Sequence, residues 1–328
     1  MAARRTNLAL LALLSVAVMS GVAMFAVGSG WNRWPTVIHG AVAISIVVLT
    51  PWKSAISRRG LDRRGARDAL PSLCLAIFVT LALVSGFAHR VGAREVGPVF
   101  VQQVHVFTAL AAIPFAVGHV MARPVPLRRT DLHRRAVLRG SALLGASAVA
   151  TVALPHAGER FTRSLERGSF DPDAMPVTQW YDDDVQSIDR DRWRLRVASR
   201  SWTFAELEAL VEERGRERVA TLDCTGGWFA DQRWSGVPLD RLLTASGATG
   251  GRSIVVRSTT GYARRFPAGD AARLLVATAV GAQPLSSGHG APARLVAPGR
   301  RGFWWVKWVE SIELSDTPWW WQSPFPLT

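Results

Sequence analysis

Residues 221–228 read TLDCTGGW and contain one of the two cysteines in a chain of 328 residues. The other, Cys74, lies in an apolar run that we expect in lipid, so we expect no disulfide between the two. A lone cysteine is most often a small buried hydrophobe. Here the residues before Cys224 predict a short strand that ends at it, and the glycines after it predict a tight turn. A thiolate presented in this way can bind a soft metal ion.

Three further sequence blocks accompany this motif. They read RWSGVPLDRLL (233–243), GHGAPARLVAPG (288–299) and VKWVESIE (306–313). With LDCTGGW, these blocks resemble the molybdopterin-binding domain of the sulfite oxidase family, which includes the periplasmic methionine-sulfoxide reductase catalytic subunit. The resemblance covers roughly residues 170–315. It implies that Cys224 is a direct molybdenum ligand beside the pterin dithiolene, and that His289, Arg294 and Lys307 contact the pterin or its phosphate.

Two departures from the sulfite-oxidising members of that family bear on the substrate. No arginine-bearing continuation follows Cys224, and the chain ends near residue 328 without room for their dimerisation domain. We therefore expect a reductase that acts on a small oxyanion or sulfoxide-type substrate. Basic residues near the expected cofactor could attract such a substrate or the cofactor phosphate, or could form a solvated basic surface. They are Arg233, Arg264, Arg265, Arg300 and Arg301.

The distribution of charge argues against a nucleic-acid partner. The chain has a formal net charge of +14, which alone could indicate nucleic-acid binding. Up to residue 155 there are 17 Lys or Arg against 4 Asp or Glu, whereas the remainder has 22 against 21. The excess therefore lies in the half of the chain that is mostly apolar, and we expect contact with membrane lipid and no nucleic-acid binding.

Apolar runs long enough to cross a bilayer indicate a membrane α-helical bundle of about five helices. They cover residues 7–29, 35–52, 69–88, 98–121 and 136–154. The first run is too long for a cleaved signal peptide. Basic residues cluster before the first run and after the second and fourth, which places those segments in the cytoplasm by the positive-inside rule. We therefore expect a multi-pass protein of the cytoplasmic membrane whose C-terminal domain is extracytoplasmic.

The basic segment before the fifth run has two interpretations. Arg134, Arg135, Leu138 and Arg139 resemble the twin-arginine export signal, which serves folded, cofactor-loaded domains. The alternative is an ordinary basic flank of a membrane span. The expected domains are a four-helix cytochrome b-like bundle (1–123), the basic loop with the fifth helix (124–156) and the extracytoplasmic molybdopterin-binding domain (157–328).

Four histidines lie in or at the ends of the predicted spans, where ligating side chains are usually functional: His39, His89, His105 and His119. His105 and His119 are 14 residues apart, which places them about 40° apart and roughly 21 Å along one helix. The bundle resembles membrane b-type cytochromes, which implies haem b. The predicted depths of these residues in the membrane favour one haem near the outer face, ligated by His105 and either His39 or His89. His119 is expected near the cytoplasmic face. For any single histidine the alternative is an interhelical hydrogen bond or an interfacial anchor.

The C-terminal part predicts an α+β domain with a mixed sheet. Strands are expected at 193–198, 253–258, 293–297 and 308–314, and a short helix at 236–243. Thr203 and Glu206 predict a capping box at the start of a helix over 203–213. The tryptophans near the C-terminus are expected to pack against the membrane or the helical half. They are Trp304, Trp305, Trp308 and Trp319 to Trp321.

Two functions remain compatible with these features. The first is a molybdenum oxidoreductase in which membrane haem b relays electrons between the quinone pool, or another carrier, and an external molybdenum centre that transfers an oxygen atom to or from a small substrate. The second is a non-catalytic membrane cytochrome whose outer domain keeps the fold but serves as a binding module. Retention of Cys224 favours the first.

Overall fold

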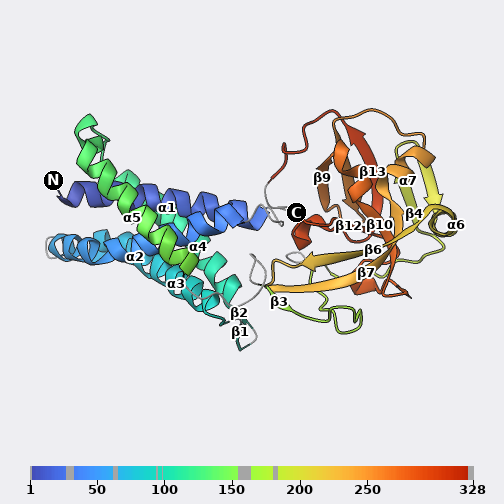
Figure 1. Ribbon diagram of the computed structural model, residues 1–328, viewed down its shortest axis with the longest axis horizontal. Coiled ribbons are helices and arrows are strands. Elements are labelled where there is room, and N and C mark those ends of the chain that lie inside the picture. Colours follow the sequence, from blue (N-terminus) through green and yellow to red (C-terminus); the bar gives the residue numbers. More distant parts are fainter. Residues whose placement is uncertain are drawn as a thin grey trace. The chain divides into compact units, whose positions relative to one another are not determined.

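The computed structural model describes residues 2–26, 33–61, 66–93, 95–97, 99–153, 164–179 and 184–323. The chain forms two compact units (Figure 1). One, the helical unit, holds the five long helices, and the other, the C-terminal unit, begins at Ser164. The boundary expected between residues 156 and 157 lies outside the described residues.

The five apolar runs form five helices, and each helix is long and apolar enough to cross a bilayer. Each helix extends past its predicted apolar run at one or both ends, in most cases because flanking polar and basic residues continue the helical backbone. The helices are α1 (Ala2–Ala26), α2 (Arg33–Leu61), α3 (Ala66–Arg90), α4 (Val101–Ala122) and α5 (Arg134–Ala153). Between α3 and α4 lies a short ribbon of β1 (Glu95–Val96) and β2 (Val99–Phe100), and the 3-10 helix η2 (Arg129–Leu132) precedes α5.

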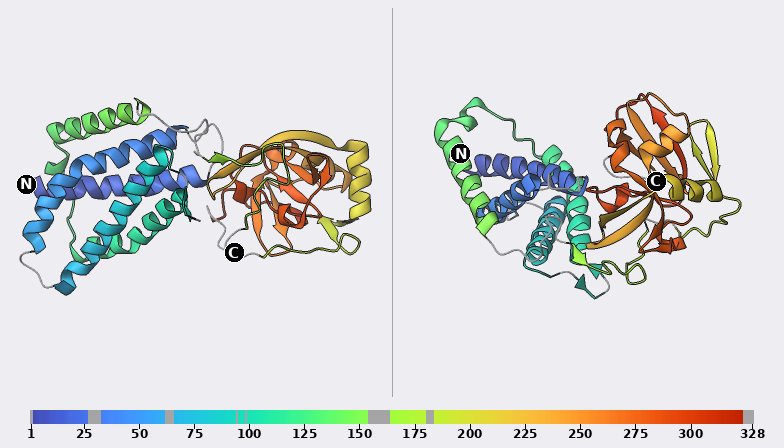
Figure 2. Two further views of the ribbon diagram at one scale, coloured as in Figure 1. Left: turned by 90° about the horizontal axis from the view of Figure 1, so that it is seen from below. Right: turned by 45° about the vertical axis from the view of Figure 1, so that its right-hand side comes forward.

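Helices pack in pairs within the helical unit (Figure 2). α3 packs along α4, and α2 packs along α5. A Cβ atom at Gly40 of α2 would lie 2.5 Å from Thr151 Cγ2 of α5. Nearby, Ser45 donates a hydrogen bond to Ser147 Oγ at 3.0 Å. Small residues and interhelical hydroxyl bonds of this kind are typical of helices that pack in lipid.

Two sheets form the core of the C-terminal unit (Figure 1). β13 pairs parallel with β4, and β3 pairs parallel with β7, whereas the other pairs are antiparallel, so the unit is α+β with mixed sheets, as predicted. The first sheet contains β3 (Leu165–Glu166), β6 (Arg216–Asp223), β7 (Trp228–Pro238), β10 (Leu275–Val280), β11 (Gln283–Pro284) and β12 (Arg294–Val296). The second runs in the order β5 (Arg200–Thr203), β4 (Arg194–Val197), β13 (Val309–Ser315), β8 (Ser253–Ser258) and β9 (Ala263–Pro267).

Helices α6 (Phe204–Arg214) and α7 (Leu239–Ala245) complete this unit. The predicted capping box of α6 is confirmed: the backbone N–H of Glu206 donates to Thr203 Oγ1 at 3.2 Å, and that of Thr203 donates to the Glu206 carboxylate at 2.7 Å. The cap fixes the start of α6 because it satisfies two backbone donors that the first turn leaves open.

The prediction for the tryptophans near the C-terminus is wrong for three of them. Trp304, Trp305 and Trp308 are only 4%, 3% and 2% exposed. Trp305 packs against Trp234 with ring centroids 5.5 Å apart, so these rings fill the core of their own unit. Trp320 and Trp321 remain exposed at the surface.

Candidate functional site

The turn between β6 and β7 presents Cys224. β6 ends one residue before it and β7 begins at Trp228, which confirms the predicted strand. The backbone N–H of Cys224 donates to Trp228 O at 2.8 Å, and that of Gly227 donates to Cys224 O at 3.2 Å. Gly227 has φ 93°, a left-handed conformation that glycine adopts without strain. The turn holds Cys224 largely buried, at 9% exposure.

Two donors face the sulfur of Cys224. Thr178 Oγ1 lies 3.3 Å from Cys224 Sγ, and the backbone N–H of Gly226 donates to the same sulfur at 3.3 Å. Burial raises the pKa of the Cys224 thiol, and these two contacts oppose the rise only in part. A bound metal ion would displace the thiol proton, because the thiolate is the form that ligates metals.

A buried ion pair fixes the backbone behind Cys224. Arg301, which is 2% exposed, donates through Nη2 to Cys224 O at 3.1 Å and lies with Nη1 3.4 Å from the Asp223 carboxylate. Ser164 donates to the same carboxylate at 2.7 Å. A Cβ atom at Gly302 would lie 3.1 Å from Cys224 Cα, so the absence of a side chain at Gly302 allows the two segments to meet.

His289 lies in a short 3-10 turn, η4 (Ser287–His289). Its Nδ1 lies 2.9 Å from Ser286 Oγ and its Nε2 lies 3.1 Å from Met175 O. Burial, aided by the charges of Arg294 and Lys307, lowers the pKa of His289 to about 4. The imidazole is therefore neutral at pH 7, with Nε2 donating to the carbonyl and Nδ1 accepting from the hydroxyl.

Arg294 is buried to 1% exposure on β12. Its guanidinium carbon lies 4.9 Å from the ring centre of Trp234 and 5.5 Å from that of Trp305, and its Nη1 donates to His289 O at 3.0 Å. Burial lowers the pKa of Arg294 to about 9, and attraction to Cys224 opposes this shift. Arg294 stays charged at neutral pH, and its charge acts on the Cys224 sulfur.

Lys307 joins the segment before β4 to the His289 turn. Its ammonium donates to Gly288 O at 2.6 Å, to Thr178 O at 2.8 Å and to Gln179 Oε1 at 3.3 Å. Gly290, at φ 104°, permits this approach, because a Cβ there would lie 3.1 Å from the Cβ atoms of both Arg294 and Lys307. A chain of direct contacts thus runs from Cys224 through Thr178 to Lys307.

The structure brings Cys224, His289, Arg294 and Lys307 into one connected site. Sequence analysis missed Thr178 and Gln179, because they lie in a stretch that reads as an irregular linker. No local pattern in that stretch indicates a site. Their role follows only from the fold, which lays residues 175–179 against both Cys224 and the His289 turn.

Unpaired buried donors indicate that the site fits an anionic cofactor. In the part of the chain that the structure describes, four buried nitrogens of residues at the Cys224 site have no hydrogen-bond partner: Trp228 Nε1, Gln179 Nε2, Arg294 Nε and Arg301 Nε. A buried donor without an acceptor is destabilising. The sulfur, ring and phosphate acceptors of a molybdopterin would satisfy such donors. His289 and Lys307 instead donate to protein acceptors, so their contacts to the pterin remain predictions.

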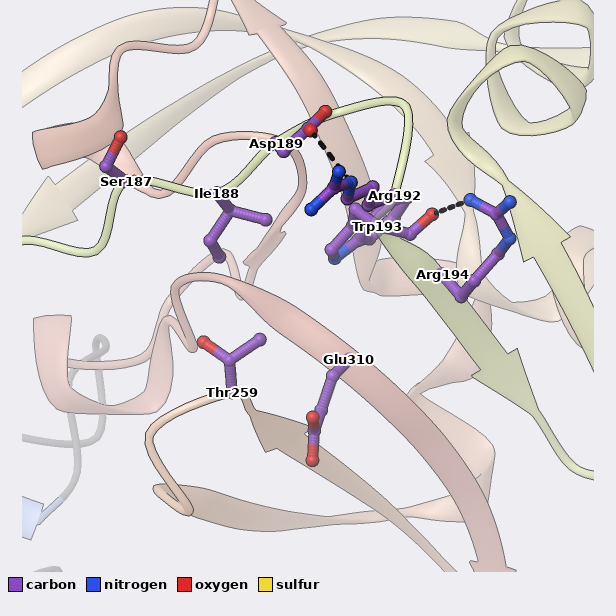
Figure 3. Close-up of a pocket in the computed structure, with 8 residues that line it drawn as sticks. All are labelled: Ser187, Ile188, Asp189, Arg192, Trp193, Arg194, Thr259 and Glu310. Carbon is purple, nitrogen blue, oxygen red and sulfur yellow. Dashed lines mark hydrogen bonds and ion pairs between the residues drawn. The ribbon is translucent and has the colours of Figure 1, made fainter.

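A surface pocket of about 400 Å³ lies beside β4 and β13 (Figure 3). None of the predicted site residues lines it. Its basic side chains already have partners: Arg192 pairs with Asp189 at 3.6 Å, and Arg194 donates to Trp193 O at 2.8 Å. These exposed, internally paired groups form a solvated surface and not the cofactor site.

In the helical unit the structure pairs His39 of α2 with His105 of α4. Their ring centroids are 5.8 Å apart and their planes are nearly perpendicular, at 87°. His39 Nδ1 lies 3.0 Å from Ala17 O of α1, and His105 Nδ1 lies 2.7 Å from Ala82 O of α3. The hydrogen bonds recorded for both rings therefore use Nδ1, which leaves the Nε2 edges for a metal ion.

Glycines lie against both imidazoles. A Cβ atom at Gly21 would lie 3.4 Å from His39 Cε1, and one at Gly86 would lie 3.0 Å from His105 Cε1. The other two predicted histidines have different surroundings: His119 Nδ1 lies 3.0 Å from Ser72 Oγ, and His89 lies in the last turn of α3. Of the two partners considered for His105, the structure brings His39 into ring contact with it.

Known proteins match this chain in part. Residues 182–322 match the family described as the oxidoreductase molybdopterin binding domain. A candidate protein-methionine-sulfoxide reductase subunit, YedZ1 of Azospira oryzae, is 25% identical over 222 residues, which cover 59% of this chain and 82% of that protein. The solved structure of the sulfane dehydrogenase SoxCD from Paracoccus pantotrophus matches with a TM-score of 0.38 and 24% identity, over 40% of this chain and 40% of that chain. The chain therefore carries a molybdopterin-binding oxidoreductase domain, and it is an oxidoreductase enzyme.

Proposed function

We propose that this protein is a membrane-anchored, molybdenum-dependent reductase of a sulfoxide-type substrate, with electrons relayed through haem b in the helical unit. The proposal rests on the presence, in one chain, of two sites whose residues could each hold a redox cofactor. One is the Cys224 site with its unpaired buried donors, and the other is the histidine pair that spans two helices of an apolar bundle.

At the first site the residues of the chain bind and orient the cofactor. Cys224 supplies a thiolate ligand, and the unpaired nitrogens of Trp228, Gln179 and Arg294 supply hydrogen bonds. When bound, the molybdenum cofactor supplies oxygen-atom transfer coupled to two electrons. Burial of Cys224 and Arg294 keeps water from the sulfur, and the positive charge of Arg294 favours the thiolate.

At the second site His39 and His105 would hold haem b, and the haem would supply one-electron transfer. Their ring centroids are 5.8 Å apart, so the two imidazoles are close enough to contact one shared group. The Nδ1 bonds to Ala17 O and Ala82 O would hold the rings in the ligating tautomer. His89 and His119 are not needed for a single haem, and His119 would serve as an interhelical hydrogen-bonding residue.

Three features support the choice of substrate, carrier and location. The relative from Azospira oryzae is named for a methionine-sulfoxide reductase, and no arginine-bearing continuation follows Cys224. Apolar helices make the quinone pool the natural source of electrons, since quinones dissolve in the same lipid. The alternation of basic segments supports a C-terminal unit outside the cytoplasm.

Metal content and turnover test this proposal. We expect the purified full chain to contain molybdenum and iron, to show a b-type haem spectrum, and to reduce methionine sulfoxide when a reduced quinone analogue is supplied. Iron without molybdenum would support the alternative, a non-catalytic cytochrome with an outer binding module. Molybdenum without iron would remove the haem relay while leaving the oxidoreductase domain.

Export of the C-terminal unit gives a separate prediction. Replacement of both Arg134 and Arg135 with lysine keeps the charge, so the positive-inside rule predicts no change, whereas recognition of paired arginines predicts that the unit stays in the cytoplasm. A reporter fused after Thr328 measures the location. An external reporter in the double variant would refute twin-arginine export, and a cytoplasmic reporter in the unmodified protein would refute the proposed topology as well.

A further inference from the structure

Among the residues that the structure describes, no carboxylate pairs with Arg264, a buried cation on β9. It is 2% exposed, and its guanidinium carbon lies 4.2 Å from the ring centre of Trp304 and 5.2 Å from that of Phe303. Its Nη1 donates to Ser323 O at 3.2 Å. Its Nε and Nη2 are buried and have no hydrogen-bond partner.

The other deeply buried arginines in the described part of the chain differ from Arg264. Arg301 pairs with the Asp223 carboxylate, and Arg294 lies in the field of the Cys224 sulfur. Burial lowers the pKa of Arg264 to about 10, so the group is still charged at neutral pH. A buried charge without a counter-charge is strongly destabilising, and contact with two aromatic rings compensates for it only in part.

A second arginine increases the positive charge at this place. The guanidinium carbon of Arg300 lies 4.9 Å from the ring centre of Trp304. Its Nη2 pairs with the Asp270 carboxylate at 2.9 Å, so Asp270 balances Arg300 and leaves Arg264 uncompensated. Two guanidinium groups on one indole ring favour the approach of an anion.

The unpaired atoms of Arg264 also have a specific geometry. Nε and the adjacent Nη2 form one edge of the planar guanidinium group. That edge presents two parallel N–H bonds, which match the two oxygens of a carboxylate. The two unpaired N–H donors of Arg264 are therefore arranged to bind a carboxylate through two hydrogen bonds.

Arg264 contacts the same short segment that backs Cys224. Arg301 donates to Cys224 O, and Gly302 lies against Cys224 Cα. The next residue, Phe303, lies under Arg264 and accepts a hydrogen bond from the hydroxyl of Tyr262. Residues 301–304 therefore contact both Cys224 and Arg264.

We propose that Arg264, supported by Arg300, forms a carboxylate subsite, so that the enzyme acts on sulfoxides that also bear a carboxylate. The inference rests on the proposed reductase function and adds the substrate class. Free methionine sulfoxide bears such a group, whereas dimethyl sulfoxide does not.

Kinetics with these two substrates test the subsite in the cofactor-loaded full chain. Arg264→Met should raise KM for methionine sulfoxide about tenfold or more, because a charge-assisted bidentate bond is lost. It should leave kcat, and the KM for dimethyl sulfoxide, close to wild type. Arg257→Met is the matched control, since Arg257 is an exposed arginine on the adjacent strand β8. An equal rise in KM for both substrates would overturn the proposal.

Anion binding without turnover provides a second measurement. Inorganic sulfate, compared with chloride at equal ionic strength, should raise the unfolding midpoint of the C-terminal unit more in wild type and in Arg257→Met than in Arg264→Met, which keeps only the general stabilisation by sulfate. If sulfate stabilises all three equally, no anion binds at Arg264 and the subsite is refuted. If wild type reduces neither sulfoxide but the sulfate effect depends on Arg264, the reductase function fails and the anion subsite stands.

Molybdenum content separates a substrate anion from the cofactor phosphate. The substrate proposal predicts equal molybdenum per chain in wild type, Arg264→Met and Arg257→Met. Loss of molybdenum in Arg264→Met alone would assign the arginine to the cofactor and overturn the substrate role.

Discussion

The two units of this protein hold their candidate sites in different ways. In the C-terminal unit Cys224, Arg294 and Arg301 are almost completely buried, and each makes at least one hydrogen bond to another strand, turn or loop. In the helical unit His39 and His105 are half-buried, and the Nδ1 of each is tied to a carbonyl of a neighbouring helix.

The two sites therefore depend on different structural features. The Cys224 site consists of local turns, such as the turn after β6 and the turn around His289, which long-range contacts then hold together. The histidine pair depends on how four helices pack, because each imidazole comes from one helix and bonds to another. A substitution at Cys224 should therefore act locally, whereas the histidine pair should respond as a unit.

The largest expected effect follows replacement of the sulfur. Cys224→Ser should reduce turnover per chain by more than about 100-fold, above the loss that is usual for residues that only support a metal ligand. A hydroxyl is a poor donor to a soft metal, but it fits the space of the thiol. Steady-state sulfoxide reduction measures the loss, and the unfolding midpoint of the C-terminal unit should stay close to wild type.

Thr178→Val provides a matched comparison for the sulfur. It removes the hydroxyl that contacts Cys224 Sγ and keeps the shape, so its effect should be much smaller than that of Cys224→Ser. Activity of Cys224→Ser equal to wild type would exclude Cys224 from the mechanism. A collapse of the fold in that variant would contradict the local character of the site.

The second-largest expected effect is the loss of haem absorption when the histidine pair is changed. His39→Ala and His105→Ala should each remove most of the b-type absorption, because both histidines would hold the same haem and loss of either one would weaken its binding. His119→Ala should retain most of it, since His119 bonds Ser72 instead. Reduced-minus-oxidised spectra of the three purified variants measure the difference.

Other spectral outcomes would change the assignment of the haem ligands in the helical unit. Equal loss in His105→Ala and His119→Ala would indicate two haems. Loss in His105→Ala with retention in His39→Ala would move the second ligand to His89. An unchanged spectrum in all variants would end the cytochrome interpretation.

Much of the fold follows from sequence periodicity. The five helices coincide with apolar runs, and the strand over residues 253–258 and the capping box at Thr203 lie where the sequence predicts them. These features are local, because chain composition and side-chain spacing determine them. Cys224 at the end of a strand was predictable for the same reason.

Contacts between distant segments were not predictable from those patterns. Thr178 reaches Cys224 across 46 positions, and Lys307 reaches Thr178 across 129, so neither contact leaves a local signature. The prediction for three of the C-terminal tryptophans was wrong for the same reason. Clustered indoles resemble a membrane-facing belt in sequence, but the two sheets enclose Trp304, Trp305 and Trp308 in their own core.

The smallest expected effect concerns the pH dependence of stability in the C-terminal unit. The folded protein holds the pKa of His289 near 4, whereas the unfolded chain has a value near 6.5. Between these values the unfolded state binds the proton and the folded state does not, so acid favours unfolding. Stability should fall as pH decreases from about 6.5 to 4, by at most about 1.4 kcal/mol per pH unit from this group.

His289→Gln isolates that contribution. The amide can replace one hydrogen bond of the imidazole but cannot titrate, so the variant should lose less stability than wild type between pH 7 and pH 5, although it starts from a lower value. Unfolding midpoints of both proteins at the two pH values give the comparison, because the two proteins differ only at residue 289. Equal pH dependence in the two proteins would mean that His289 is not held neutral. The dense hydrogen bonding that separates this unit from the helical one would then not extend to the turn that carries it.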